Sequence, residues 1–182
     1  FFKNFKNVKT LIVDNFLEDP DKIRKFALSL NYRKRNEHEN FEGMRGPLIK
    51  DVNINMHNKI CNKIIFEYYR KNPISFIADL QFHKTQEKDR RDFQFMYNRV
   101  HQDNGVIAGM VYLTPNAPIN CGTQTYQEII INKKYEPDIK IGNIYNRLVL
   151  YPAEYFHSAM DYFGDNKNNR LVMLFFLMEV KF

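Results

Sequence analysis

The sequence has few of the residues and patterns that stabilise small secreted proteins or cross membranes. Its 182 residues contain no tryptophan and only two cysteines, Cys61 and Cys121, which are too few for a disulfide framework. The longest apolar run, at 171–178, has eight residues, whereas a membrane-spanning helix needs about 20. Residues 1–10 lack the apolar core and the small-residue cleavage site of a signal peptide. We therefore expect a cytoplasmic protein that does not contact a membrane and keeps both thiols reduced and buried.

Aromatic residues, by contrast, are abundant. The chain contains 16 Phe and 11 Tyr, and its 44% hydrophobic and 26% charged residues are typical of a globular domain. The net charge of +6 and the pI of about 9.2 are compatible with a nucleic-acid partner. That partner is not favoured, because the basic clusters at 32–40 and 87–93 also contain acidic residues and are typical of solvated loops.

The first 72 residues carry helical patterns. A short apolar strand is expected at 11–13 and is followed by a helix, which Asp19 can cap and for which Pro20 suits the first turn. The segment 31–47 is charged and punctuated by glycines, which predicts an irregular loop. A second helix is expected from about 52 to 70, because apolar residues recur there every four positions.

Beyond residue 73 the pattern changes to strands. Six aromatic or β-branched runs are separated by Asn, Gly and Pro turns, at 74–83, 92–101, 105–114, 121–130, 142–151 and 169–180. Two helices followed by six strands predict an α+β protein with a jelly-roll or sandwich core and helices packed on one side. We expect one domain, 1–182, with a helical support region at 1–72 and the strand core at 73–182.

The stretch His101-Gln102-Asp103 lies within this strand-rich half. Residues two apart on a strand project from the same face, so His101 and Asp103 could point together into a cavity. His157 follows later, and two histidines with one carboxylate form the ligand set that non-haem Fe(II) oxygenases use. Arg170 begins an otherwise apolar strand, where its guanidinium could hold a carboxylate inside a barrel. A hydrogen-bonded pair at a strand end is the alternative interpretation of His101 and Asp103.

These residues, in this order, resemble the HxD…H…R signature of the 2-oxoglutarate- and Fe(II)-dependent dioxygenases. The segments 111–126 and 147–164 resemble the prolyl 4-hydroxylase-like branch of that superfamily, and within it a microbial and phage group. Residues 11–28 resemble the strand-then-helix opening of such proteins. The resemblance covers most of the chain and is best from 97 to 176. It implies a double-stranded β-helix core of the jelly-roll or cupin type.

Carried over to this sequence, the resemblance implies that His101, Asp103 and His157 bind Fe(II). It implies that Arg170 pairs with the distal carboxylate of 2-oxoglutarate, while O₂ is the other co-substrate. No catalytic residue is implied beyond the metal ligands. Because related halogenases replace the ligand carboxylate with a small residue, the presence of Asp103 favours hydroxylation or demethylation over halogenation.

Strand parity adds further candidates. Tyr97 and Arg99 share the face of His101 if the strand is regular, so Arg99 is a candidate substrate contact. Tyr97 or Tyr112 is a candidate hydroxyl donor to 2-oxoglutarate, and Thr125 and Asn146 are further candidates. His38, His57 and His83 have no partner at ligand spacing, which favours surface or supporting positions for them.

Two other functions compete with a hydroxylase. The first is a non-catalytic cupin-like protein that binds a metal or ligand. The second is a nucleic-acid-modifying, demethylating oxygenase, suggested by the pI near 9.2. Substrate specificity is expected in loops at 31–50, 83–92 and 114–140, whose composition predicts neither the primary substrate nor the oligomeric state.

Overall fold

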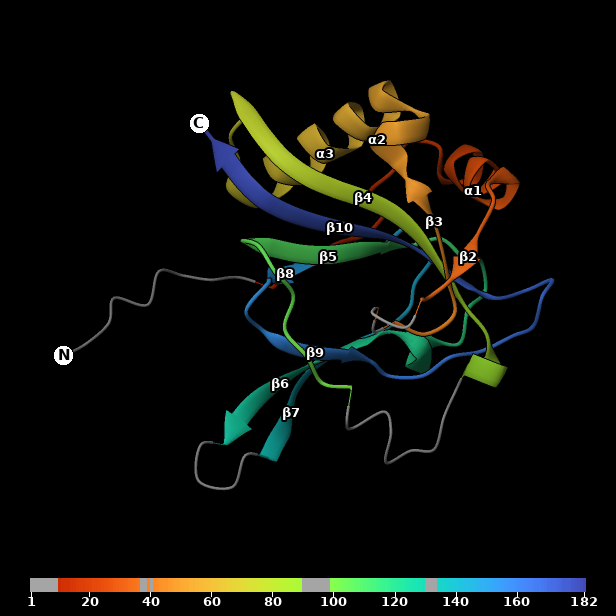
Figure 1. Ribbon diagram of the computed structural model, residues 1–182. Coiled ribbons are helices and arrows are strands. Elements are labelled where there is room, and N and C mark those ends of the chain that lie inside the picture. Colours follow the sequence, from red (N-terminus) through yellow and green to blue (C-terminus); the bar gives the residue numbers. More distant parts are fainter. Residues whose placement is uncertain (1–9, 37–38, 40, 90–98, 130–133) are drawn as a thin grey trace.

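The computed structural model describes residues 10–36, 39, 41–89, 99–129 and 134–182, and it has the form of two facing antiparallel sheets (Figure 1). The larger sheet contains, in spatial order, β1 (Leu11–Val13), β8 (Leu148–Pro152), β5 (Ile107–Tyr112), β10 (Arg170–Lys181), β4 (Ser75–Thr85), β3 (Met44–Leu48) and β2 (Arg33–Lys34). The smaller sheet contains β7 (Lys134–Ile141), β6 (Thr123–Ile129) and β9 (Phe156–Ala159).

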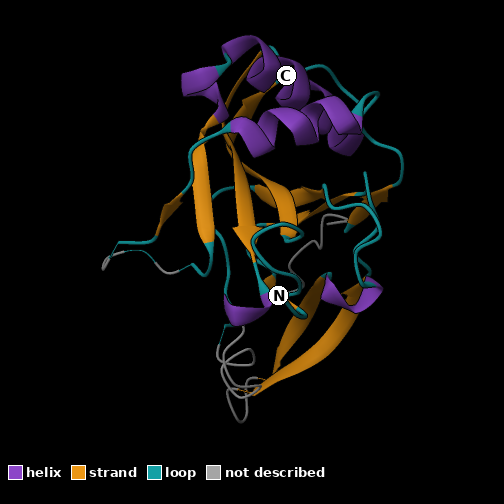
Figure 2. Ribbon diagram, turned by 90° about the vertical axis from the view of Figure 1, so that its right-hand side faces the viewer, coloured by secondary structure: helices purple, strands orange, loops and turns teal. Residues whose placement is uncertain are grey.

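Three helices cover one face of the larger sheet, as Figure 2 shows from the side. They are α1 (Pro20–Ser29), α2 (Ile49–Val52) and α3 (Ile54–Tyr69). The side chain of Asp19 accepts a hydrogen bond from the backbone N–H of Lys22 at 2.9 Å and caps α1. Asn53 caps α3 in the same way, and Arg70, in the left-handed conformation with φ of 56°, ends it.

The central strand β10 separates two hydrophobic clusters. Leu171, Met173 and Phe175 face the helices and pack with the apolar side of α3. The alternate residues Val172 and Leu174 face the smaller sheet and pack with residues of β5 and β8. Because neighbouring positions on a strand point to opposite faces, one continuous apolar run serves both layers.

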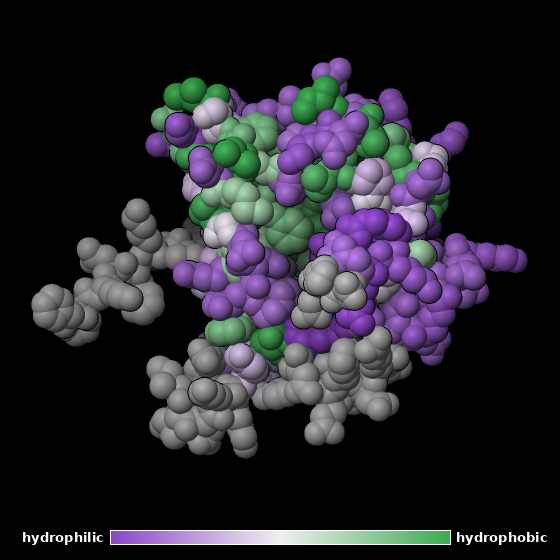
Figure 3. All heavy atoms as spheres, in the orientation of Figure 1, coloured by the Kyte–Doolittle hydropathy of each residue, from purple (hydrophilic) through white to green (hydrophobic). Residues whose placement is uncertain are grey.

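The distribution of polarity differs between the outer and inner faces. On the face shown in Figure 3, hydrophobic residues are exposed mainly in the upper part, around the helices and the nearby strand ends. Exposed apolar side chains in the described chain include Ile54, Phe66, Ile74, Ile77 and Phe182. Polar side chains are instead buried where the two sheets face each other, His83, Thr123, Thr125, His157 and Arg170 among them. This inner face is therefore the place to look for a functional site.

Most of the expected elements are present. The first helix begins at Pro20, and the second helix begins at Ile54 rather than at 52. Five of the six strand-like runs contain strands of the two sheets, and most of the sixth, 92–101, lies outside the described residues. Among the described residues, no helix is long and apolar enough to cross a membrane. Cys61 and Cys121 are both buried free thiols.

Two segments differ from the expectation. The loop expected at 31–47 contains β2 and part of β3, so the first 72 residues contribute strands as well as helices to the structure. Strand β7 was not expected, because its sequence is charged and contains Pro137. In both cases pairing with a neighbouring strand, β4 for β3 and β6 for β7, outweighs weak intrinsic strand propensity.

Candidate metal centre

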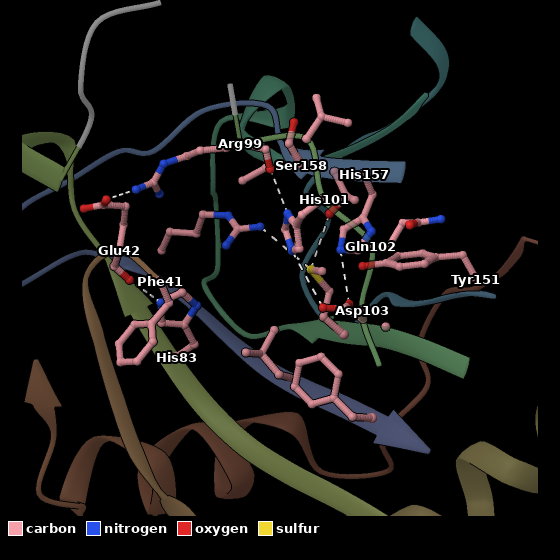
Figure 4. Close-up of a pocket in the computed structure, with 18 of the residues that line it drawn as sticks. Phe41, Glu42, His83, Arg99, His101, Gln102, Asp103, Tyr151, His157 and Ser158 are labelled. Carbon is pink, nitrogen blue, oxygen red and sulfur yellow. Dashed lines mark hydrogen bonds and ion pairs between the residues drawn. The ribbon is translucent and has the colours of Figure 1, made fainter. Parts of the chain in front are cut away.

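A cavity of about 400 Å³ opens between the two sheets (Figure 4). The larger sheet contributes an apolar wall that includes Met110, Tyr151, Leu174 and Phe176. The smaller sheet contributes Thr123, His157 and Ala159, and the segment 99–103 closes another side. The volume lies near the lower end of the range of about 300–1,000 Å³ for small-molecule pockets.

His101 and His157 are held opposite each other by the backbone. The N–H of His101 donates to the carbonyl of His157 at 3.1 Å, and the reverse hydrogen bond measures 2.9 Å. Asp103 is fixed separately, because its N–H donates to the carbonyl of Ala153 at 2.8 Å. Residues 101–103 therefore do not form the regular strand assumed from the sequence. An isolated bridge to β9 brings the side chains together instead.

The backbone also determines which imidazole nitrogen faces the carboxylate. Nδ1 of His101 lies 2.7 Å from the carbonyl oxygen of Arg99, and Nδ1 of His157 lies 2.9 Å from that of Tyr155. A carbonyl can only accept, so each Nδ1 carries a proton and, in a neutral ring, each Nε2 carries a lone pair. Desolvation and the neighbouring His157 ring lower the pKa of His101, which favours its neutral form.

Both Nε2 atoms point toward Asp103 (Figure 4). His157 Nε2 lies 3.2 Å from Oδ2 and His101 Nε2 lies 3.7 Å from Oδ1, and the three ligand atoms lie within 4.8 Å of one another. Donors on one face of an octahedral site with bonds of about 2.1 Å lie about 3 Å apart. Two nitrogens and one carboxylate oxygen at this spacing fit a first-row divalent metal with open coordination positions.

The triad is buried on one side and open on the other. The side chain of His157 is 6% exposed and that of Asp103 is 16% exposed, whereas that of His101 is 54% exposed. The buried Tyr151 ring lies against His157 with ring centroids 4.6 Å apart, which limits movement of that imidazole. A small molecule could therefore approach a bound metal from the cavity without displacing a protein ligand.

Arg170 occupies the start of β10 and also lines the cavity. The residue is only 3% exposed, so it is not a surface residue that happens to begin a strand. Its Nε donates to the carbonyl of Cys121 at 2.9 Å, and its guanidinium lies 5.7 Å from the centroid of the Tyr112 ring. No carboxylate of the described residues forms an ion pair with it. The cavity thus contains a buried cation able to bind an anionic ligand.

The other sequence candidates differ in position. Tyr112 is fully buried behind the cavity wall, and its hydroxyl lies 2.8 Å from Oγ1 of Thr123, which does line the cavity. Tyr97 lies outside the described residues. Thr125 accepts a hydrogen bond from the N–H of Ile139.

Asn146 makes hydrogen bonds that join two parts of the backbone. Its side-chain oxygen accepts from the N–H of Leu17 at 2.8 Å, and its amide nitrogen donates to the carbonyl of Leu17 at 2.9 Å. These bonds join the turn before β8 to the segment that follows β1. The side chain does not point into the cavity.

Arg99 lines the cavity, although residues 99–103 do not form the regular strand on which its candidacy was based. Its guanidinium forms an ion pair with Glu42 (Figure 4). It also donates to the hydroxyl of Tyr162 at 3.3 Å. This pair joins the segment before the metal triad to the segment before β3. Its charge is therefore neutralised within the protein.

Sequence reasoning missed several cavity residues. Arg45 and His83, which are partners in the pairing of β3 with β4, both line the cavity. Of the two positions expected for His83, the surface position is wrong, because the residue is buried and its Nε2 lies near the carbonyl of Glu42. Burial lowers the pKa of His83 well below its ordinary value, and Arg45 and Arg170 lower it further, so the ring is neutral. His57 is also buried, against the carbonyl of Ala78 on β4.

The fold is shared with solved oxygenase structures. A prolyl hydroxylase from Trichoplax adhaerens, in complex with a hypoxia-inducible-factor peptide fragment, is 12% identical with a TM-score of 0.53, and the match covers 94% of this chain and 84% of that one. SnoN, a non-haem α-ketoglutarate-dependent epimerase from nogalamycin biosynthesis, is 11% identical with a TM-score of 0.59 and coverage of 96% and 80%. HygX from Streptomyces hygroscopicus, with nickel, 2-oxoglutarate and hygromycin B bound, is 11% identical with a TM-score of 0.57 and coverage of 94% and 83%.

These matches confirm the expected α+β double-stranded β-helix fold. They also agree with the resemblance drawn from the sequence, at the level of the fold. Comparison with protein-family models and with curated proteins found no match.

Proposed function

We propose that this protein is an Fe(II)- and 2-oxoglutarate-dependent oxygenase of the hydroxylase type. The observation that carries the proposal is the convergence of His101, Asp103 and His157 in one cavity with Arg170, a cation that no carboxylate of the described chain neutralises. Either feature alone would be weaker support, since polar triads and buried arginines also occur as structural elements. A ligand set with open positions and a cation in the same cavity match the needs of a metal and a dicarboxylate together.

Each residue has a distinct task in this proposal. His101 and His157 would bind the metal through Nε2, because their Nδ1 atoms are committed to backbone carbonyls. Asp103 would supply the third ligand and part of the compensating negative charge. When bound, Fe(II) with 2-oxoglutarate and O₂ supplies the oxidising chemistry, and the protein supplies position and shelter.

Arg170 would hold the distal carboxylate of 2-oxoglutarate. Its Nε donates to the carbonyl of Cys121, and its Nη2 makes only a weak contact with Sδ of Met110 at 3.8 Å, so the terminal nitrogens would hold the ligand. Thr123 is the better candidate for an accompanying hydroxyl, because it lines the cavity and Tyr112 does not. Tyr112 would then orient that hydroxyl from behind. The apolar wall around Leu174 and Phe176 would exclude water from the reacting centre.

The assignment to the hydroxylase type needs an argument of its own. The fold alone does not select it, since one of the similar structures is an epimerase. Asp103 supports it against halogenation, because the carboxylate fills the position that a halide would need at the metal. Metal binding without turnover would instead favour the alternative of a non-catalytic binding protein.

Oxygen-dependent release of succinate from 2-oxoglutarate tests the proposal. Protein supplied with Fe(II) should convert 2-oxoglutarate to succinate slowly even without a primary substrate. The His157→Ala variant should not do so above the rate of free Fe(II). Equal rates for the two proteins would contradict the proposal.

A further inference from the structure

Arg45 lines the cavity together with Arg99 and Arg170. It lies on β3 and pairs with His83 of β4, which in turn pairs with Val172 of β10. Directly opposite residues of a sheet share a face, so Arg45 belongs to the same inner face as Val172. Its guanidinium carbon lies 4.2 Å from the centroid of the Phe41 ring, which also lines the cavity, so the two side chains form a cation–π contact.

No ion pair within the described chain neutralises Arg45. The residue is partly buried, and its Nε is inaccessible to solvent and has no hydrogen-bond partner among the described residues. Desolvation lowers the pKa of Arg45, while Asp103 and Glu39 attract its charge and Arg33 repels it. Arginine nevertheless stays protonated, so a desolvated cation is left facing the cavity.

The carboxylates around Arg45 that the structure describes have other partners. Glu42 is paired with Arg99. Glu39 is held by both terminal nitrogens of Arg33, each contact measuring 2.6 Å. Asp103 belongs to the proposed metal site, and the neutral His83 cannot compensate a positive charge. An anionic ligand in the cavity would supply the missing counter-charge.

We propose that Arg45 binds an anionic group of the primary substrate, a carboxylate or a tetrahedral oxyanion, across the cavity from the metal triad. This inference rests on the proposed function, in which Arg170 serves 2-oxoglutarate. A cavity of about 400 Å³ accepts a small acidic molecule, or one acidic side chain of a larger one, beside the co-substrate. The protein then contains two cationic positions, one for each of the two anions that must bind together.

The two arginines are not equivalent. Arg170 is the more deeply buried and donates to a backbone carbonyl, which fixes it for a ligand that binds in every turnover. Arg45 is only partly buried and lies on the short strand β3, in a part of the cavity wall that also contains the Arg99–Glu42 pair. This position distinguishes a substrate contact from a co-substrate contact.

Calorimetric titration at constant ionic strength tests the assignment. The protein is loaded with Mn(II), in place of Fe(II), and saturating 2-oxoglutarate, and it is then titrated with N-acetylglycine, its neutral amide, or sulfate. We expect N-acetylglycine or sulfate to bind at least tenfold more tightly than the amide. The Arg45→Gln variant should lose that preference, whereas Lys59→Gln, which removes an exposed charge from α3, should keep it.

Stability provides a second readout. If Arg45 serves to bind a ligand, the ligand-free Arg45→Gln protein should have an unfolding temperature equal to or higher than that of the wild type. The substitution removes a cation that has no counter-charge in the described protein. A lower unfolding temperature, with no anion preference in the wild type, would show that Arg45 is a structural residue stacked on Phe41 and would overturn the inference. Equal anion binding by Arg45→Gln and the wild type would also overturn it.

The affinity for 2-oxoglutarate separates this inference from the proposed function. A tenfold loss of that affinity in Arg45→Gln would assign Arg45 to the co-substrate and overturn the inference. The same anion titrations are repeated without metal and 2-oxoglutarate. An Arg45-dependent anion site in a protein that binds neither would sustain the inference of an anion site while the proposed function fails.

Discussion

His101 and His157 face each other across an isolated antiparallel bridge, with ring centroids 4.4 Å apart and backbone hydrogen bonds in both directions. The bridge connects a segment outside the two sheets to β9. It places two imidazoles side by side through backbone hydrogen bonds. The backbone pairing of the fold therefore positions two of the three candidate metal ligands.

Removing the third ligand should abolish metal binding while leaving the fold intact. In Asp103→Ala the affinity for Fe(II) should fall by at least about 100-fold, since two imidazoles remain without a carboxylate. The apoprotein should unfold at nearly the wild-type temperature, because Asp103 is not part of the core. Equilibrium titration with Fe(II) under anaerobic conditions measures the affinity. Asp51→Ala, which removes an exposed carboxylate from α2, is the matched control, and a similar loss in it would contradict the assignment.

Replacing Arg170 should affect the co-substrate and not the metal. Hydrogen bonds to charged groups contribute about 1.5–3 kcal/mol, so Arg170→Gln should weaken 2-oxoglutarate binding by roughly 10–100-fold. Arg170→Lys should recover part of the affinity, because it restores the charge without the planar fork. Competition titrations with metal-loaded protein measure both. A proportional loss of Fe(II) affinity would instead indicate that Arg170 supports the fold of the site.

Asn146 should matter for stability alone. Its side chain makes two hydrogen bonds to the backbone of Leu17, and its φ of 61° is left-handed. Asn146→Ala should lower the free energy of unfolding by about 2–3 kcal/mol, since buried backbone groups lose their partners. Urea denaturation checks the value. Asn146→Gly keeps the backbone conformation without strain, so any remaining loss in it reports the hydrogen bonds. Impaired metal binding in a folded Asn146→Ala protein would contradict this structural role.

The ion pair between Asp14 and Arg147 should make stability depend on acid pH. The hydrogen bond from Arg147 holds the pKa of Asp14 below its ordinary value, although burial opposes this. The pKa of an aspartate in the unfolded chain is about 4. Because the pKa is lower in the folded protein, the ion pair stabilises the protein at pH values above about 4. This stabilisation is lost as the pH falls through the folded-state pKa. Because Asp14 is about half exposed, the contribution should stay below about 1 kcal/mol.

Comparison of Asp14→Asn with the wild type across pH isolates this contribution. The two proteins should differ in unfolding free energy at pH 7, and the difference should shrink as the pH falls below about 4. A difference that does not decrease between pH 7 and pH 3 would show that the aspartate acts through something other than its charge.

Much of the fold could be predicted because its central strands have strong local signals. β10 is an unbroken apolar run with polar residues only near its ends, and β5 and β8 are rich in β-branched and aromatic residues. β3 could not be predicted in the same way. Its sequence, Met-Arg-Gly-Pro-Leu, has weak strand propensity, and it is extended because it pairs with β4.

The residues of the candidate site could be predicted only where their order along the sequence matches a known ligand pattern. His101, Asp103, His157 and Arg170 are recognisable from their spacing, although the regular strand assumed for the first two is absent. Arg45 carries no such signal. Its approach to the cavity follows from the register of β3 against β4, which depends on tertiary pairing.

Anaerobic titration of the metal-free protein with Fe(II) and 2-oxoglutarate, followed by the visible absorption band of the chelate, tests the central claim most directly. The band should form in the wild type, be absent in Asp103→Ala, and require far more 2-oxoglutarate in Arg170→Gln. A folded wild-type protein that gives no band at saturating Fe(II) and 2-oxoglutarate would contradict the account, and the His-Asp-His cluster would then be a structural element.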